Sequence, residues 1–194
     1  HNVERGKGAV SYKAGEIIFI KINRTSTYQM KSGFGRGNTN EYPICETSPH
    51  VVTSVLRHLV NEVGVAQKDI YIGDPLKNIY ADDYAKWHGE FPDVHYLDNS
   101  SSSSGREKVV KSTTAIIDYS DRGEVLRTGS WNSALDGQPF YTDNLYTIFE
   151  EMEYMINIPT LKGHIRAGVT MFAKNHFGSH TRGDAKHLHG GLVE

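Results

Sequence analysis

Apolar residues along this chain form short β-branched runs and one long helical repeat. Residues 16–23 are a nearly continuous apolar run, which is typical of a buried central strand. Ser48 and Pro49 then suit the cap and first turn of a helix that Gly64 would end. Its predicted apolar face consists of Val51, Val52, Val55, Leu56, Leu59, Val60 and Val63. A second short strand at 69–75 completes a strand–helix–strand unit, which predicts two parallel strands.

The rest of the chain continues this alternation. The pattern predicts a short helix at 79–90, strands at 94–97, 115–119 and 153–158, loop-rich sequence at 129–146, and a helix at 166–175. Together these elements predict an α/β fold, Rossmann-like, with a mostly parallel sheet and helices on both faces. We expect one domain over residues 1–194. Because the sequence starts at His1 without Met and ends without a natural stop signal, we expect it to be a fragment of a longer chain or a processed one.

Composition narrows the function classes. Hydrophobic residues make up 38% and charged residues 23%, as in ordinary globular proteins. A net charge of −2 provides no basic field for nucleic acid, and no apolar run is long enough for a membrane span. Cys45 is the single cysteine, so this chain alone cannot hold an iron–sulfur cluster, which needs four thiolates.

Cationic and amide side chains follow several of the predicted strands. In parallel α/β sheets, ligands bind beyond the carboxyl ends of the strands. The residues expected there to bind a small anionic ligand are Lys21, Asn23, Ser48, Asp74, Lys162, His164, Lys174 and Asn175. If the domain is an enzyme, His164 is the predicted general acid or base, and Lys162 and Lys174 are its catalytic cations. A solvated rim of charges would give the same pattern, and Asp74 before Pro75 is also typical of a simple turn.

Two alternatives come from other parts of the chain. Histidines cluster near its end, which suggests a module binding a divalent transition metal through His164, His176 and His180, with His187 and His189 and either Asp74 or Asp184 as further ligands. A flexible histidine-rich loop is the competing interpretation. The glycine-dotted segment 24–46, with Arg36, predicts a long loop that a non-catalytic binding domain would use to recognise a partner.

Several motifs together resemble a known family, the bacterial and archaeal domain catalogued as DUF362. They are Ile18-Phe19-Ile20-Lys21-Ile22-Asn23, Thr47-Ser48-Pro49-His50-Val51-Val52, Ile72-Gly73-Asp74, Ile156-Asn157-Ile158-Pro159-Thr160-Leu161-Lys162-Gly163-His164, Gly168-Val169-Thr170 and Lys174-Asn175-His176-Phe177-Gly178. The resemblance covers about residues 16 to 180, and little of the stretch 79–150 contributes to it. It implies an α/β domain without an assigned reaction.

The same resemblance raises an expectation about partners. Some relatives are fused to iron–sulfur ferredoxin modules, which implies that a redox role here would need a redox partner or the missing remainder of the chain. Some relatives also look exported from the bacterial cell. Cofactor, substrate and location remain open at this level.

Overall fold

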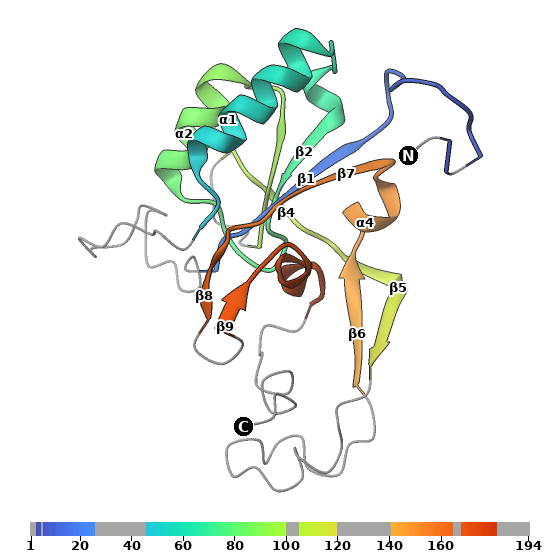
Figure 1. Cartoon of the computed structure of the whole chain (residues 1–194), viewed down its shortest axis with the longest axis vertical. Helices are drawn as coiled ribbons and strands as arrows, with labels where there is room; N and C mark the ends of the chain where they lie inside the picture. Colours follow the sequence, from blue (N-terminus) through green and yellow to red (C-terminus); the bar gives the residue numbers. More distant parts are fainter. Residues whose placement is uncertain are drawn as a thin grey trace, which may run out of the picture.

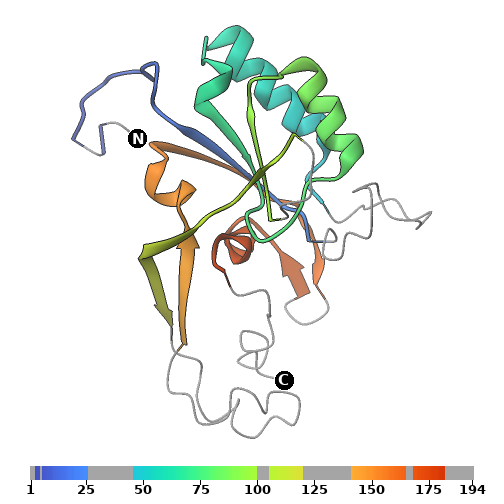
Figure 2. The same cartoon turned by 180° about the vertical axis from the view of Figure 1, so that it is seen from behind.

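The computed structural model describes residues 3–4, 6–25, 46–99, 105–119, 141–164 and 168–181. Its centre is a five-stranded parallel sheet with the strand order β4-β3-β2-β1-β7 (Figures 1 and 2). The strands are β1 (Ile18–Ile22), β2 (Ile70–Gly73), β3 (His95–Asp98), β4 (Glu107–Lys108) and β7 (Tyr154–Ile158). The predicted α/β class with a mostly parallel sheet is therefore confirmed.

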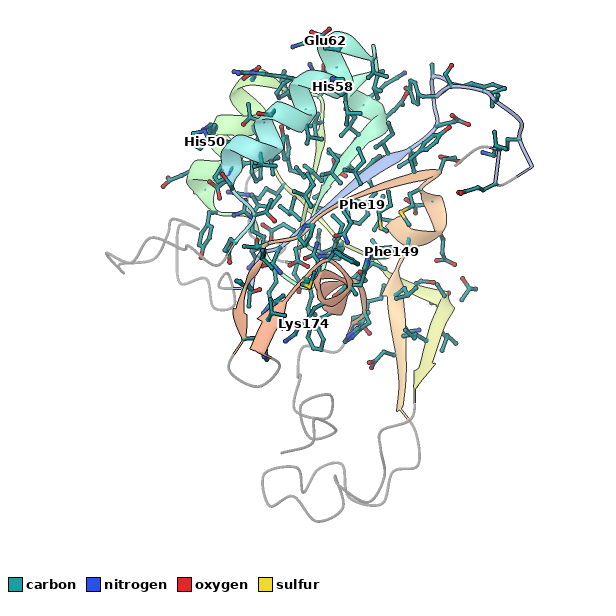
Figure 3. All side chains as sticks on the ribbon, viewed as in Figure 1. Phe19, His50, His58, Glu62, Phe149 and Lys174 are labelled. Carbon is teal, nitrogen blue, oxygen red and sulfur yellow. The ribbon has the colours of Figure 1, made fainter. Side chains whose placement is uncertain are left out.

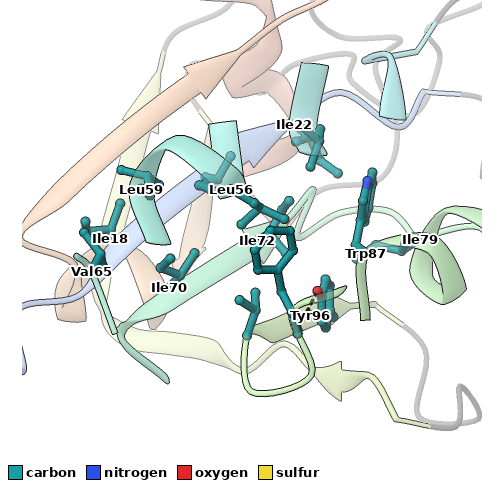
Figure 4. Close-up of a cluster of buried hydrophobic side chains, with 14 residues drawn as sticks. Ile18, Ile22, Leu56, Leu59, Val65, Ile70, Ile72, Ile79, Trp87 and Tyr96 are labelled. Atoms are coloured by element: carbon teal, nitrogen blue, oxygen red, sulfur yellow. Dashed lines mark hydrogen bonds between the residues drawn. The ribbon is translucent and has the colours of Figure 1, made fainter. Parts of the chain in front are cut away.

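The sheet has two differently covered faces. Ile18, Ile20 and Ile22 of β1 point to the face covered by α1 (Pro49–Arg57) and α2 (Ala81–Glu90) (Figure 4). Phe19 points the other way, where it packs near Ile148 and Phe149 of the short helix α4 (Ile148–Glu151). That second face carries a four-residue helix, a 3-10 helix and strands rather than long helices.

Helix α1 begins where the sequence predicts, with Pro49 as its first residue. The Ser48 side chain makes no capping hydrogen bond, and its backbone carbonyl accepts from the Val52 amide instead. After α1 comes a π-helical turn, η1 (His58–Glu62), and then Gly64 in the left-handed region at φ 79°.

The predicted apolar face of this helix is partly wrong. Val52, Leu56 and Leu59 are buried, but Val51 and Val63 are 47% and 51% exposed. The π turn explains Val63, whose amide bonds to the carbonyl of His58 five residues earlier. The extra residue in that turn rotates Val63 away from the core.

Two further predictions are corrected by the structure. Residues 141–146, expected in a loop, form β6 (Tyr141–Tyr146), which pairs antiparallel with β5 (Lys111–Tyr119). The helix expected at 166–175 is absent, because 168–170 form β9 (Gly168–Thr170), antiparallel to β8 (Lys162–His164). Gly168 at φ 70° and the β-branched pair after it favour a hairpin over a helix. A 3-10 helix, η4 (Ala173–Ser179), follows.

Some sequence-based predictions lie outside the described residues. These are Cys45, most of the 24–46 loop with Arg36, and the distal group Asp184, His187 and His189. Within the described residues, no helix is both long and apolar enough to cross a membrane.

The corrected burial pattern of α1 gives a direct test. Leu56→Ala should lower the free energy of unfolding by about 2–5 kcal/mol, because it leaves a cavity between α1 and the sheet. Val51→Ala, five residues earlier and exposed, should change it by no more than about 0.5 kcal/mol. Urea unfolding followed by circular dichroism measures both, and equal losses would contradict this assignment of the buried face.

Candidate functional site

The sheet has a topological switch point between β1 and β7. Strands β2, β3 and β4 lie in that order on one side of β1, and β7, which comes later in the chain, lies on its other side. Open α/β sheets bind ligands at such a point, beyond the carboxyl ends of the strands. Thr47 links the carboxyl ends of β1 and β7. Its hydroxyl accepts a hydrogen bond from the Asn23 amide at 2.8 Å and donates one to the Ile158 carbonyl at 2.7 Å.

Lys21, near the end of β1, is fully buried on the face opposite α1. Its Nζ lies 2.8 Å from Asp74 Oδ1, 2.8 Å from the Ile22 carbonyl and 3.4 Å from Asn175 Oδ1. Burial lowers the pKa of Lys21, and the charge of Asp74 opposes this shift. An ammonium has three hydrogens, and three protein acceptors surround this one.

Asp74 follows β2 and completes this buried ion pair. Its second carboxylate oxygen accepts the Arg24 amide at 2.9 Å. Gly178 of η4 lies directly against the pair, and a Cβ there would overlap Asp74 Oδ1. The Gly178 carbonyl also accepts the Leu76 amide at 3.2 Å. The sequence left Asp74 as either a turn residue or a ligand, and the structure makes it the partner of Lys21.

Amide side chains extend the network from the ion pair to β7. Asn175 Oδ1 accepts from Asn23 Nδ2 at 3.2 Å, and Asn175 Nδ2 donates to Asn157 Oδ1 at 2.7 Å. Asn157 Nδ2 donates to the Phe172 carbonyl at 3.0 Å. No role for Asn157 is predicted from the sequence, although it is a polar residue within the apolar strand β7, in register with Lys21. These contacts fix η4 against the sheet.

The β8–β9 hairpin lies beside this edge and carries two predicted site residues (Figures 1 and 2). Lys162 Nζ donates to Asn23 Oδ1 at 3.0 Å and to Thr25 Oγ1 at 2.8 Å. His164, two residues along β8, shares its face by strand alternation, and Thr170 is the cross-strand neighbour of Lys162. The structure therefore brings Lys162 and Asn23 together at the switch point, and His164 lies on the same face of β8 as Lys162.

Lys174, at the start of η4, lies beside the hairpin (Figure 3). Its Nζ is buried, and among the residues that the structure describes nothing accepts a hydrogen bond from it. Burial lowers the pKa of Lys174, and the neighbouring charge of Lys162 lowers it further. The hydroxyls of Thr160 and Thr170 are likewise buried and unpartnered. Three polar groups around the hairpin thus lack partners.

The predicted metal ligands are not gathered in the described part of the chain, which contains no group of three His, Cys, Asp or Glu side chains suited to a metal. His176 Nε2 lies 3.3 Å from Asn157 Nδ2, and Nδ1 lies 3.2 Å from Ser179 Oγ. Burial, together with the charge of Lys21, lowers the pKa of His176. His180 lies with Nδ1 3.6 Å from Asp143 Oδ2.

Arg24 is a buried site residue that the sequence analysis missed. Its guanidinium contacts Glu46 Oε2 at 3.1 Å and Asp83 Oδ2 at 2.7 Å, and lies 5.0 Å from the centroid of the Trp87 ring. It anchors the carboxyl end of β1 to α2. Its place directly after a buried strand was the available signal. Ser48, predicted to bind the ligand, is exposed at the start of α1.

Comparison with known proteins confirms the resemblance seen in the sequence. The family model described as "Domain of unknown function (DUF362)" matches residues 30–192. The chain matches no curated protein and no solved structure.

The contact between η4 and the buried ion pair predicts a sharp glycine requirement. Gly178→Ala should destabilise the domain by at least about 2 kcal/mol, because the new methyl group must displace Asp74 or η4. Gly163→Ala, at an exposed position of β8 with open space around it, is the matched control and should be neutral or slightly stabilising. Thermal unfolding compares them, and equal stability of the two variants would refute this packing.

Proposed function

Because the chain belongs to the DUF362 family, whose description assigns no activity, we propose its function from the site itself: it binds a small oxyanion at the switch point between β1 and β7. Lys162 and Lys174 supply the positive charge, and the hydroxyls of Thr160 and Thr170 supply further hydrogen bonds. Lys21, Asp74, Asn23 and Asn175 hold these groups in place. Phosphate, sulfate and carboxylate groups share the required chemistry.

The buried, unpartnered ammonium of Lys174 is the observation that carries this proposal. Leaving a buried polar group without a partner costs about 1–3 kcal/mol, and more when the group is charged. The charge that acts on Lys174 from nearby is another ammonium, Lys162, so the repulsion adds to the cost. A bound oxyanion would satisfy the hydrogen bonds and neutralise both charges at once, whereas an ordered water would satisfy only the hydrogen bonds.

The surrounding contacts support a site that is arranged before the ligand arrives. Lys162 is held by Asn23 and Thr25, and η4 is held by the Asn175 amide and by Gly178 against Asp74. Donors fixed in advance lose little entropy when the ligand binds, which favours affinity and selectivity.

His164 is the group in this proposal that would take part in a reaction. It lies on the same face of β8 as Lys162, so an oxyanion held by Lys162 would lie near its imidazole. An imidazole next to a bound ligand can donate or accept a proton near neutral pH. If the domain is a catalyst, His164→Ala should lower turnover while leaving the affinity for the anion nearly unchanged.

Replacing Lys174 separates binding from stability. Lys174→Met should weaken sulfate binding about tenfold or more, because one of the two charges is lost. The same substitution should stabilise the unliganded protein by about 1–3 kcal/mol, because it removes a buried charge that has no partner. Isothermal titration calorimetry with sulfate and thermal unfolding in sulfate-free buffer measure the two effects.

A matched lysine provides the control. Lys68 is exposed just before β2, at the amino-terminal ends of the strands. Lys68→Met should therefore change neither sulfate affinity nor stability appreciably. Undiminished sulfate binding by Lys174→Met would refute the proposal. A stability gain without any sulfate binding by the wild type would indicate that water alone occupies the site.

The lowered pKa of Lys174 predicts proton uptake on binding. A bound anion raises that pKa, so sulfate affinity should be constant at low pH and fall as pH rises through the pKa of Lys174 in the free protein. The sulfate affinity should level off above the pKa that Lys174 has in the complex. Sulfate itself does not titrate in this range, so the slope reports on the protein. Calorimetry in buffers of different ionisation enthalpy measures the protons taken up, and Lys174→Met should abolish most of that uptake.

A further inference from the structure

A pocket of about 680 Å³ opens beyond the carboxyl ends of β2, β3 and β4. It shares no lining residue with the Lys162–Lys174 site. Its lining consists of Leu76, Asn99, Lys108, Val109, Val110, Lys111, Tyr146 and Thr181. A pocket of this size falls within the range of about 300–1,000 Å³ that is usual for small organic ligands.

The pocket is made by elements on two sides. Leu76 and Asn99 come from the segments that follow β2 and β3, and Lys108 and Lys111 flank the link from β4 to β5. Tyr146, at the end of β6, forms another wall, and Thr181 lies just past η4. The pocket therefore lies at the same carboxyl edge of the sheet as the switch point. It lies over β2, β3 and β4, whereas the switch point lies between β1 and β7.

The tyrosine wall is held in place by hydrogen bonds. Asn99 Nδ2 donates to Tyr146 Oη at 3.1 Å and to the Pro75 carbonyl at 2.7 Å. The Asn99 backbone amide also donates to the Lys77 carbonyl at 3.1 Å. Tyr146 is buried and packs in the same apolar cluster as Val109. One side of the pocket is therefore a fixed surface, part aromatic and part aliphatic.

The other notable feature is uncompensated positive charge. Lys108 and Lys111 both line the pocket, and neither side chain takes part in an ion pair or hydrogen bond within the part of the chain that the structure describes. Among the lining residues that the structure describes, none is an aspartate or a glutamate. A ligand in this pocket would therefore meet two cations next to an apolar wall.

We infer that this pocket binds an organic anion with an apolar body. Lys108 and Lys111 contact its anionic head, and Leu76, Val109 and Tyr146 pack against its body. An inorganic oxyanion would leave the apolar wall uncovered, and an uncharged apolar molecule would leave both lysines unsatisfied. This inference does not depend on the proposed oxyanion site.

A matched pair of dyes tests both halves of the inference. The first is 1-anilinonaphthalene-8-sulfonate, an aromatic sulfonate, and the second is N-phenyl-1-naphthylamine, the same body without the sulfonate. The double variant Lys108→Met/Lys111→Met should bind the sulfonate about tenfold more weakly and bind the amine as the wild type does. Both lysines are exposed, so the variant should fold, and its circular dichroism melt checks this. Lys68→Met is the charge-matched control.

The same experiment identifies dye bound elsewhere. A second, mostly apolar pocket of about 540 Å³ lies near the amino ends of β1 and β7 and includes Met155. Loss of sulfonate binding in Met155→Glu but not in the double lysine variant would place the dye there and overturn the inference. Loss in Lys174→Met alone would place it at the oxyanion site and overturn it equally. Sulfate titrated into the double lysine variant tests the proposed function separately.

Discussion

The buried ion pair between Lys21 and Asp74 is the interaction on which the site depends. Removing two charges from water is costly, and the interior compensates only when the remaining hydrogen-bonding groups are also satisfied. Here Asp74 also accepts the Arg24 amide, and Lys21 also contacts the Ile22 carbonyl and Asn175. The pair joins β1 to the end of β2, and η4 can pack onto it because Gly178 has no side chain. One polar contact thus fixes three segments that are distant in the sequence.

Fixing η4 has a consequence for the residues that it carries. Lys174 begins this segment and is held near Lys162 without a partner of its own. The Asn175 amide and Gly178 fix η4 against the sheet, and Lys174 Nζ lies buried beside the hairpin in this arrangement. The hydrogen-bonded network of Lys21, Asp74 and Asn175 therefore keeps Lys174 in its unpartnered position. This arrangement is expected where a binding site reduces stability for the sake of function.

Sequence pattern predicted the sheet better than the site. The buried runs of β1 and β2, and the start of the helix between them at Pro49, follow from local rules, so the parallel unit was predictable. The predicted side-chain cap from Ser48 is not made. Lys21 and Asp74 were both picked out as polar residues at strand ends, yet their pairing depends on strand register, which single residues do not reveal. The helix expected at 166–175 is wrong because Gly168, with its positive φ, and the β-branched Val169 and Thr170 favour a strand that pairs with β8. The contacts of Asn157 and Arg24 could not be predicted, because they form only between elements that are distant in the sequence. Asn157 joins β7 to η4, and Arg24 joins the end of β1 to α2.

The carboxyl edge of the sheet is wide enough for two chemically different regions, and η4 connects them. Lys174 at its start lies by the β8–β9 hairpin, and Thr181 just past its end lines the pocket over β2 to β4. Between them, Asn175 and Gly178 contact the Lys21–Asp74 pair. The first region has buried donors on Lys174, Thr160 and Thr170, which suits a compact oxyanion. The second has an apolar wall with cations beside it, which suits a larger amphipathic anion. η4 therefore links the region around Lys174 to the buried ion pair, and the chain just past η4 reaches the pocket.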